Sequence, residues 1–303
     1  MVAPQSPIGS RRRLGAELRR LRAKTGLTLD EVAEQMTCSP SKISRLETGK
    51  GIPKVPDVSM LMKIYGVASD TERDMLLRLV RDGRQQGWWV PLTEGVAPER
   101  FVFDSPARYA SLENDATAIR SFDTTAVHGL LQTADYARAV VSALLPHHSA
   151  EEIERLVVLR TMRQDALHRS DPPPPRLTVV LDEAVLARPV GGPAVMTAQL
   201  SRLRELVALP HVTVRVLPFV ASMVRAHAGR FVLLSIPDDL GSDVVYVEGG
   251  TGEAYLDHEP DVERYEEVFA DAEAHALDPV ESLEMITRYE KQHAPLNWKA
   301  PTS

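Results

Sequence analysis

The stretch from Ser39 to Pro53 carries the side chains that most readily suggest chemistry. It reads SPSKISRLETGKGIP, with apolar residues only at Ile43 and Leu46 before Gly49 ends the pattern. On a helix of this register the outward positions are Pro40, Ser41, Lys42, Ser44 and Arg45. Their hydroxyl, ammonium and guanidinium groups donate hydrogen bonds and add positive charge, which suits an anionic partner. A helix with so narrow an apolar face fits contact with a partner better than a place in a core.

Two helices precede this stretch and position it. Leucines recur at helical spacing between residues 10 and 24, and Gly26 can end that helix. Thr28 and Glu31 have the spacing of a capping box, which predicts a second helix over 29–36. The turn is then 37–39, with Ser39 as the cap of the third helix and Pro40 in its first position.

Two more helices are predicted to close an all-α bundle. Their apolar positions are Val58, Leu61, Ile64 and Tyr65 in one helix and Leu76 and Leu79 in the next. Two short helices joined by a tight turn, the second with a polar outer face, form a helix-turn-helix. The outer face of the third helix is therefore predicted to read DNA.

Charge is distributed unevenly along the 303 residues. Residues 1–84 hold 16 Lys and Arg against 10 Asp and Glu, whereas the remainder holds 19 against 32. A basic segment on an acidic protein indicates a polyanion-binding module joined to a domain of another kind. We therefore expect a DNA-binding domain over 1–84.

Composition is that of an ordinary globular protein, 44% hydrophobic and 25% charged. No apolar run approaches the roughly 20 residues that span a bilayer, and no apolar segment follows the basic N-terminus. Cys38 is the single cysteine, so no internal disulfide can form. These features predict a cytoplasmic protein that does not enter membranes.

The remaining chain is predicted to form a large α+β domain in two parts. Residues 85–170 are the connecting and helical part, with helix expected throughout 106–123. Prolines at 172–175 forbid helix, and 171–303 is the α/β part. Strands at 176–181 and 211–219 flank a helix at 193–209, which predicts a right-handed βαβ unit. Strands at 230–236, 244–248 and 255–256 form a meander, and helices follow at 261–277 and 279–292.

No residue set in the large part supports catalysis, a cofactor or a metal. EGGTGEAY follows one strand and leads into another, so it is predicted to be a hairpin turn rather than a phosphate loop. Asp182 and Glu183 end a strand, where they can also open a helix. His147, His148 and His227 have no partner cluster at metal-ligand spacing. We therefore expect a protein that is not an enzyme.

Residues 11–84 resemble the Xre, or lambda-repressor, class of helix-turn-helix domains through the motif LTLDEVAEQMTCSPSKISRLETGKGIP. The resemblance implies that the outward residues of the third helix face base edges and nearby phosphates. Arg45 is then the candidate for a bidentate contact to guanine, Lys42 can meet a phosphate instead of a base, and Thr28 suits a backbone phosphate. It also implies a structural ion pair between Glu47 and Arg22. The arginines at 11–13 either add phosphate contacts or form a solvated arm.

Residues 88–290 resemble the large domain of actinobacterial Xre-type regulators of the WhiJ-like class, also described as antitoxin-like. The resemblance rests on eight ordered strings: WW, LE-x-x-A-x-x-I, GLLQTADYARAV, RQDAL, LDEAVLARPVGG, MTAQLSRL, VTVRVLPF and VVYVE. It departs at His128, where the class has proline. The class implies a transcription regulator that works with a small BldB-like protein encoded by the neighbouring gene. Trp88 and Trp89 are expected to pack between domains, and Gly129–Thr133 is either a structural corner or a partner or ligand site.

Three hypotheses follow, of which the first is favoured. It is a sequence-specific regulator that binds double-stranded DNA as a homodimer, with half-sites about 34 Å apart. The second is an antitoxin-like protein that neutralises its small neighbour and uses DNA binding to autoregulate its operon. The third, an enzyme controlled by its DNA-binding half, requires convergent carboxylates in a pocket.

Overall fold

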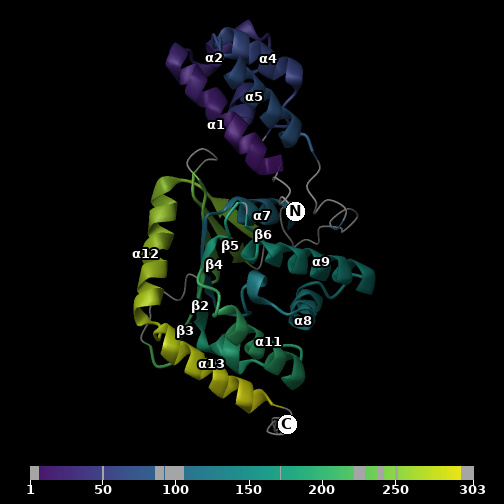
Figure 1. Ribbon diagram of the computed structural model, residues 1–303, viewed down its shortest axis with the longest axis vertical. Helices are drawn as coiled ribbons and strands as arrows, with labels where there is room; N and C mark the ends of the chain where they lie inside the picture. The colour runs from purple at the N-terminus through teal and green to yellow at the C-terminus, as the bar shows by residue number, and fades with distance from the viewer. Residues whose placement is uncertain are drawn as a thin grey trace. The chain divides into compact units, whose positions relative to one another are not determined.

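The computed structural model describes residues 7–49, 51–85, 92, 106–170, 172–221, 229–237, 242–249 and 252–294. It separates into two compact units, one built mainly from the N-terminal helices and one from a sheet with its covering helices (Figure 1). The predicted fold class, a helical N-terminal region followed by a mixed α and β part, is confirmed. Within the described residues, no helix is both long enough and apolar enough to cross a membrane.

The first unit contains the five predicted helices. They are α1 (Pro7–Thr25), α2 (Leu29–Gln35), α3 (Pro40–Glu47), α4 (Val55–Ile64) and α5 (Asp70–Gly83); α7 (Pro106–Asp115) is grouped with this unit. All five N-terminal helices bury their predicted apolar positions in one core, including Leu18, Val32, Ile43, Leu61 and Leu76, each fully buried. Burial at three- and four-residue spacing explains why these segments are helical.

The ends of the short helices follow the capping residues. Thr28 caps α2, and Glu31 completes the predicted capping box. Ser39 occupies the N-cap of α3 and Pro40 its first position, as predicted. The Ser39 hydroxyl, however, accepts no bond from a helix amide and instead lies 3.0 Å from the Ser41 hydroxyl. The fixed φ of proline therefore contributes to this start where a side-chain cap was expected.

The second unit is organised on one six-stranded sheet. Its strands are β1 (Ala118–Asp123), β2 (Arg176–Asp182), β3 (Val212–Leu217), β4 (Phe231–Ser235), β5 (Val244–Gly249) and β6 (Gly252–Leu256), in the order β3-β2-β1-β4-β5-β6. The first three strands are parallel, which confirms the predicted pairing of β2 and β3. The last three form the predicted antiparallel meander. Pairing of Gly249 with Gly252 confirms a hairpin at EGGTGEAY, of which Gly250 and Thr251 lie outside the described residues.

The prediction of helix throughout 106–123 was wrong. α7 ends at Asp115, and β1 lies in the middle of the sheet between β2 and β4. Ile119 and Ser121 point to one face and Phe122 to the other, a period of two that is hard to recognise in so short and polar a segment. Strand formation here depends on pairing with residues about 58 and 110 positions later in the chain, and such non-local contacts override local propensity.

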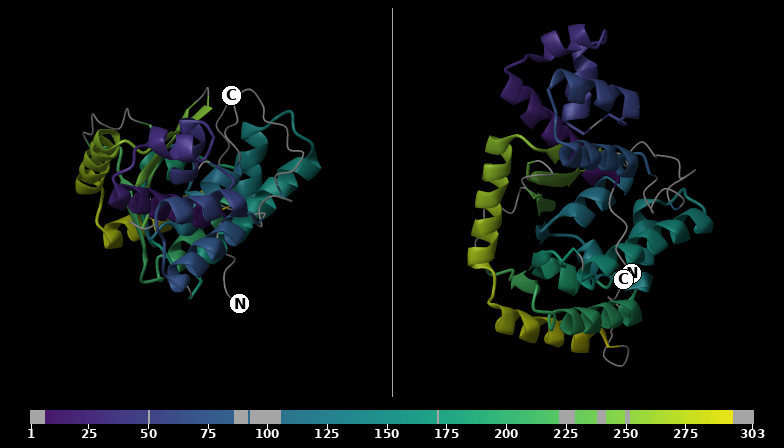
Figure 2. Two further views of the ribbon diagram at one scale, coloured as in Figure 1. Left: turned by 90° about the horizontal axis from the view of Figure 1, so that it is seen from above. Right: turned by 45° about the horizontal axis from the view of Figure 1, so that its top comes forward.

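Helices cover both faces of the sheet. Their bounds are α8 (Ala134–Leu144), α9 (Ala150–Arg163), α10 (Glu183–Ala187), α11 (Pro193–Leu206), α12 (Glu259–His275) and α13 (Pro279–His293), with 3-10 turns η1 (Gly129–Leu131) and η2 (Gln164–Leu167). Figure 1 shows α12 on one side of the strands and α8, α9 and α11 on the other. In the right view of Figure 2, α13 runs beside α11. The face under α12 is an apolar core that includes Phe122, Phe231 and Phe269.

We predict that replacing Phe122 by alanine lowers the free energy of unfolding by about 3–5 kcal/mol. The ring is fully buried, 6.1 Å from the ring of Phe231 between centroids, and its removal leaves a cavity in the middle of the sheet. Urea unfolding monitored by circular dichroism measures the change. Leu144→Ala is the control, because that side chain is 51% exposed and should change the free energy by no more than about 0.5 kcal/mol. Equal effects of the two substitutions would contradict the central placement of β1.

Candidate nucleic-acid interface

The third helix presents the polar surface that the sequence predicts. Ile43 is fully buried and Leu46 is 5% exposed, and both face the core of the first unit. Pro40, Ser41 and Arg45 are exposed on the outside. α2 and α3 are joined by a short turn that includes Thr37 at a φ of 52°. This pair of helices has the arrangement of a helix-turn-helix.

An ion pair anchors the end of this helix. Arg22 Nε donates to Glu47 Oε1 at 2.7 Å, and its Nη2 donates to Glu47 Oε2 at 2.9 Å. A third bond runs from Arg22 Nη1 to the carbonyl of Leu27 at 3.0 Å. The Glu47 side chain is 2% exposed, and its hydrogen bonds raise the pKa of Arg22 above the ordinary value. The ion pair implied by the resemblance is therefore present, and it ties α3 to α1.

Close approach of the backbones strengthens this anchor. A side chain on Gly15, in the middle of α1, would lie 2.5 Å from the carbonyl oxygen of Glu47. Gly49, which ends α3 as predicted, has a φ of 69° and lies against the backbone of Arg12. Only glycine fits either position without displacing a neighbouring helix. The sequence signal for this close packing is Gly15 itself, a glycine inside an otherwise helical pattern.

Arg45 is the exposed cation of the interface. No described residue forms an ion pair or side-chain hydrogen bond with its guanidinium, whose neighbours on the helix are Ser41 and Ser44. A guanidinium in this state keeps its five donors for an external acceptor. The geometry is thus compatible with the predicted base contact.

Lys42 is engaged within the protein. Its Nζ lies 2.8 Å from Oδ1 of Asp57, in the first turn of α4. The Lys42 side chain is 43% exposed and that of Asp57 is 20% exposed. Asp57 lies fifteen residues further along the chain, and only the tertiary fold of the bundle brings the two side chains together. No local pattern in the sequence marks Asp57 as the partner of Lys42.

Thr28 is also engaged within the protein. Its amide and hydroxyl donate to Glu31 Oε2 at 2.8 and 2.9 Å, and its hydroxyl accepts from the Glu31 amide. These bonds hold the pKa of Glu31 below its ordinary value. A phosphate bound at the start of α2 would have to share the amide and hydroxyl donors of Thr28 with the carboxylate of Glu31.

The arginines at 11–13 lie inside α1, so they do not form a separate arm. Arg11 is partly buried, and its Nε donates to the carbonyl of Gly83 at the end of α5, at 2.6 Å. Burial lowers the pKa of Arg11 from its ordinary value. Arg11 therefore joins two helices of the bundle.

The segment Gly129–Thr133 forms a hydrogen-bonded corner in the second unit. Gln132 Nε2 donates to the Val127 carbonyl at 2.7 Å, and Gln199 on α11 both accepts from the Thr133 amide and donates to the Leu131 carbonyl. Thr133 caps α8, as predicted, by accepting from the amide of Tyr136. Internal contacts of this kind favour the structural-corner interpretation.

His128 lies just before this corner, at the position where the resembling class has proline. The residue is fully buried, and its Nδ1 accepts from the amide of Leu130 at 3.3 Å. A proline ring has no acceptor for this bond. The imidazole thus caps the 3-10 turn η1.

The remaining candidates for a catalytic or metal site either have structural roles or lie outside the described residues. Asp182 caps α10, and Glu183 accepts from the amide of Phe219 and the hydroxyl of Tyr289. His227, Trp88 and Trp89 lie outside the described residues. Among the residues that are described, no group of His, Cys, Asp and Glu has the arrangement of a metal site.

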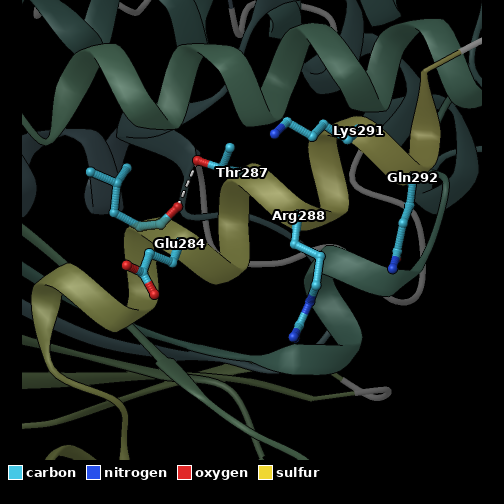
Figure 3. Close-up of a pocket in the computed structure, with 6 residues that line it drawn as sticks. Glu284, Thr287, Arg288, Lys291 and Gln292 are labelled. Atoms are coloured by element: carbon cyan, nitrogen blue, oxygen red, sulfur yellow. Dashed lines mark hydrogen bonds between the residues drawn. The ribbon is translucent and has the colours of Figure 1, made fainter.

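The second unit has a depression along α13. It has a volume of about 770 Å³ and is lined by α13 through Leu283, Glu284, Thr287, Arg288, Lys291 and Gln292 (Figure 3). Four of these side chains are exposed, and Thr287 donates to the Leu283 carbonyl of its own helix. A ligand site usually combines enclosure with a few convergent polar groups. A single helix face of this kind does not favour the enzyme hypothesis.

Comparison with known protein families gives two matches. Residues 13–76 match a family described as a helix-turn-helix domain. With the geometry of α2 and α3, this match identifies a DNA-binding regulator of the helix-turn-helix class. Residues 106–288, more than half of the chain, match the domain of unknown function DUF5753, and the protein belongs to that family. No curated protein and no solved structure matches the chain.

We predict that Glu47→Gln lowers the free energy of unfolding of the first unit by about 3 kcal/mol. The substitution keeps the shape of the side chain but leaves the guanidinium of Arg22 without its counter-charge in a largely buried place. Thermal unfolding of the full chain measures the loss. Glu72→Gln is the matched control, since it breaks the more exposed pair with Arg20 between α5 and α1 and should cost about 0.2–1 kcal/mol. A loss no larger than that of the control would rule out the anchoring role.

Proposed function

We propose that the protein is a sequence-specific transcription regulator of the Xre type that reads DNA through the outer face of α3. The observation that carries this proposal is the exposed Arg45 guanidinium, without a partner among the described residues, on a helix anchored by the Arg22–Glu47 pair. A fixed helix with a free bidentate donor is what base recognition in the major groove requires. The basic balance of residues 1–84 supports an electrostatic contribution from phosphates.

The six proposed contact residues divide between contacts to bases and contacts to phosphates. Arg45 contacts guanine, and Ser41 and Ser44 donate to base edges or phosphates. Pro40 packs at the helix start against the groove, while Lys42 and Thr28 contact phosphates. Phosphate contacts fix the position of the helix on the duplex, and base contacts discriminate between sequences.

The regulator acts in this proposal as a cytoplasmic homodimer, because one short helix covers only a few base pairs. Two copies bind half-sites of a pseudo-palindrome about one helical turn apart. No enzymatic step is part of the proposed function.

The large domain is proposed to bind an effector, namely the small BldB-like protein of the WhiJ-like class. Support comes from two exposed apolar side chains on α9: Val158 and Met162 lie one turn apart and are 39% and 41% exposed. Exposed apolar side chains one turn apart on a single helix suit a protein partner better than a small polar ligand.

We predict that Arg45→Ala weakens binding to the specific site by about 1–3 kcal/mol, roughly a 5- to 150-fold rise in Kd. Purified full-length protein is titrated against its own upstream region and against a scrambled duplex at one fixed salt concentration. Binding to the scrambled duplex should change little. Arg73→Ala removes an equal charge from the exposed side of α5 and serves as the control. Equal, weak binding of both duplexes by the wild type and by Arg45→Ala would contradict base reading by the free protein.

We also predict that a saturating amount of the small neighbour-encoded protein changes the DNA affinity of the wild type. A partner that alters the spacing of two DNA-binding domains affects both half-sites at once. Val158→Glu with Met162→Glu should abolish this change without altering the DNA affinity of the regulator alone. An unchanged affinity at saturation would refute this mode of regulation, and growth arrest by the small protein alone would favour the antitoxin-like hypothesis.

A further inference from the structure

The two cations on the outer face of α3 are in different states. Arg45 has no side-chain partner among the described residues, whereas Lys42 is paired with Asp57 across a distance of 2.8 Å between Nζ and Oδ1. Both side chains of the pair are partly exposed. A phosphate that approaches α3 therefore finds one free donor group and one that is already neutralised.

Asp57 is fixed in its place independently of Lys42. It lies in the first turn of α4, three residues after the N-cap residue Lys54, where the helix dipole favours a carboxylate. Val58 and Leu61 on the same helix are fully buried, so α4 cannot follow a departing lysine. When Lys42 moves to a phosphate, the Asp57 carboxylate stays beside the DNA-binding surface without its counter-charge.

We infer that Asp57 is an affinity- and specificity-setting residue that competes with DNA phosphate for the Lys42 ammonium. This inference rests on the proposed function and extends it to a residue that itself makes no contact with DNA. Sequence-independent binding to DNA is mainly electrostatic and depends on how many phosphates are neutralised. By restraining Lys42, Asp57 weakens this part of the binding and leaves the base contact of Arg45 intact, which widens the gap between specific and unspecific DNA.

A purely structural role of the pair makes a different prediction. If the ion pair served only to join α3 and α4, its loss would misplace the recognition helix and weaken all DNA binding. Competition predicts the opposite sign, because loss of the carboxylate releases a cation toward the phosphates. The sign of the change therefore separates the two roles.

The test compares Asp57→Asn with Asp74→Asn in the full-length protein. Asp74 is exposed on α5, so its substitution removes the same charge without touching Lys42. Affinity for the upstream region and for a scrambled duplex is measured over a series of salt concentrations. We expect Asp57→Asn to bind the scrambled duplex about two- to fivefold more tightly, as for an exposed ion pair, and to steepen the salt slope by up to about 0.9, because Lys42 engages a phosphate only part of the time while Asp57 competes for it. The ratio of specific to unspecific affinity should fall, and Asp74→Asn should show none of these changes.

The same substitution in a Lys42→Met background supplies the second comparison. There the gain from Asp57→Asn should shrink to the effect of Asp74→Asn, because no ammonium remains to be released. Lys63→Met, an exposed lysine near the end of α4, is the control background in which the full gain should persist. Thermal unfolding checks that each variant is folded.

The outcomes separate this inference from the proposed function. If the wild type discriminates between the duplexes and Asp57→Asn behaves like Asp74→Asn, or weakens binding to both, the competition is refuted and base reading stands. If the wild type and Arg45→Ala bind neither duplex, or bind both alike, the proposed function and this inference fail together.

Discussion

The fixed orientation of α3 within the helical bundle is the constraint on which the DNA-binding half depends. The helix has eight residues and buries only Ile43, Leu46 and Glu47, so its apolar surface alone fixes its orientation weakly. The Arg22–Glu47 pair supplies the missing restraint through two charge-assisted bonds, and Gly15 lets α1 approach closely enough to make them. A recognition helix has to keep its outer face polar. The contacts that anchor this helix must therefore be made by its C-terminal end and its buried face, as they are in this structure.

The outer surface of this helix is not a simple array of free donors. Asp57 engages Lys42, and Glu31 engages the amide and hydroxyl of Thr28. A phosphate contact proposed at either residue would have to displace or share an existing partner, whereas the Arg45 guanidinium has no partner among the described residues. Under the proposed function, the unspecific attraction of this surface for DNA is lower than a count of its cations implies. The proposed base contact of Arg45 then carries a larger share of the binding free energy.

The second unit depends in a similar way on the middle of its sheet. Asp123, at the end of β1, is fully buried, with hydrogen bonds from Ser121 and from Arg230, which also pairs with Glu248 on β5. A buried carboxylate needs such partners, because an unpaired charge would cost several kcal/mol (~3–5). The pairs join β1, β4 and β5 where the sheet changes from parallel to antiparallel. Further along the chain, the hydrogen bonds of Gln132 and Gln199 around Gly129–Thr133 fix the connection that leads from β1 towards β2.

Local chemistry in the sequence determined the helical bundle, the capping box at Thr28, the β2–α11–β3 unit and the residues of α3 that face outward. These features depend on periodicity and on contacts between residues three or four positions apart, which a sequence displays directly. Tertiary structure decided the rest. β1 exists as a strand because β2 and β4 pair with it, and the state of Lys42 depends on a carboxylate carried by the next helix. Contacts between residues distant in the chain leave no local pattern, since they are selected by the packing of whole elements rather than by the neighbours of a residue in sequence.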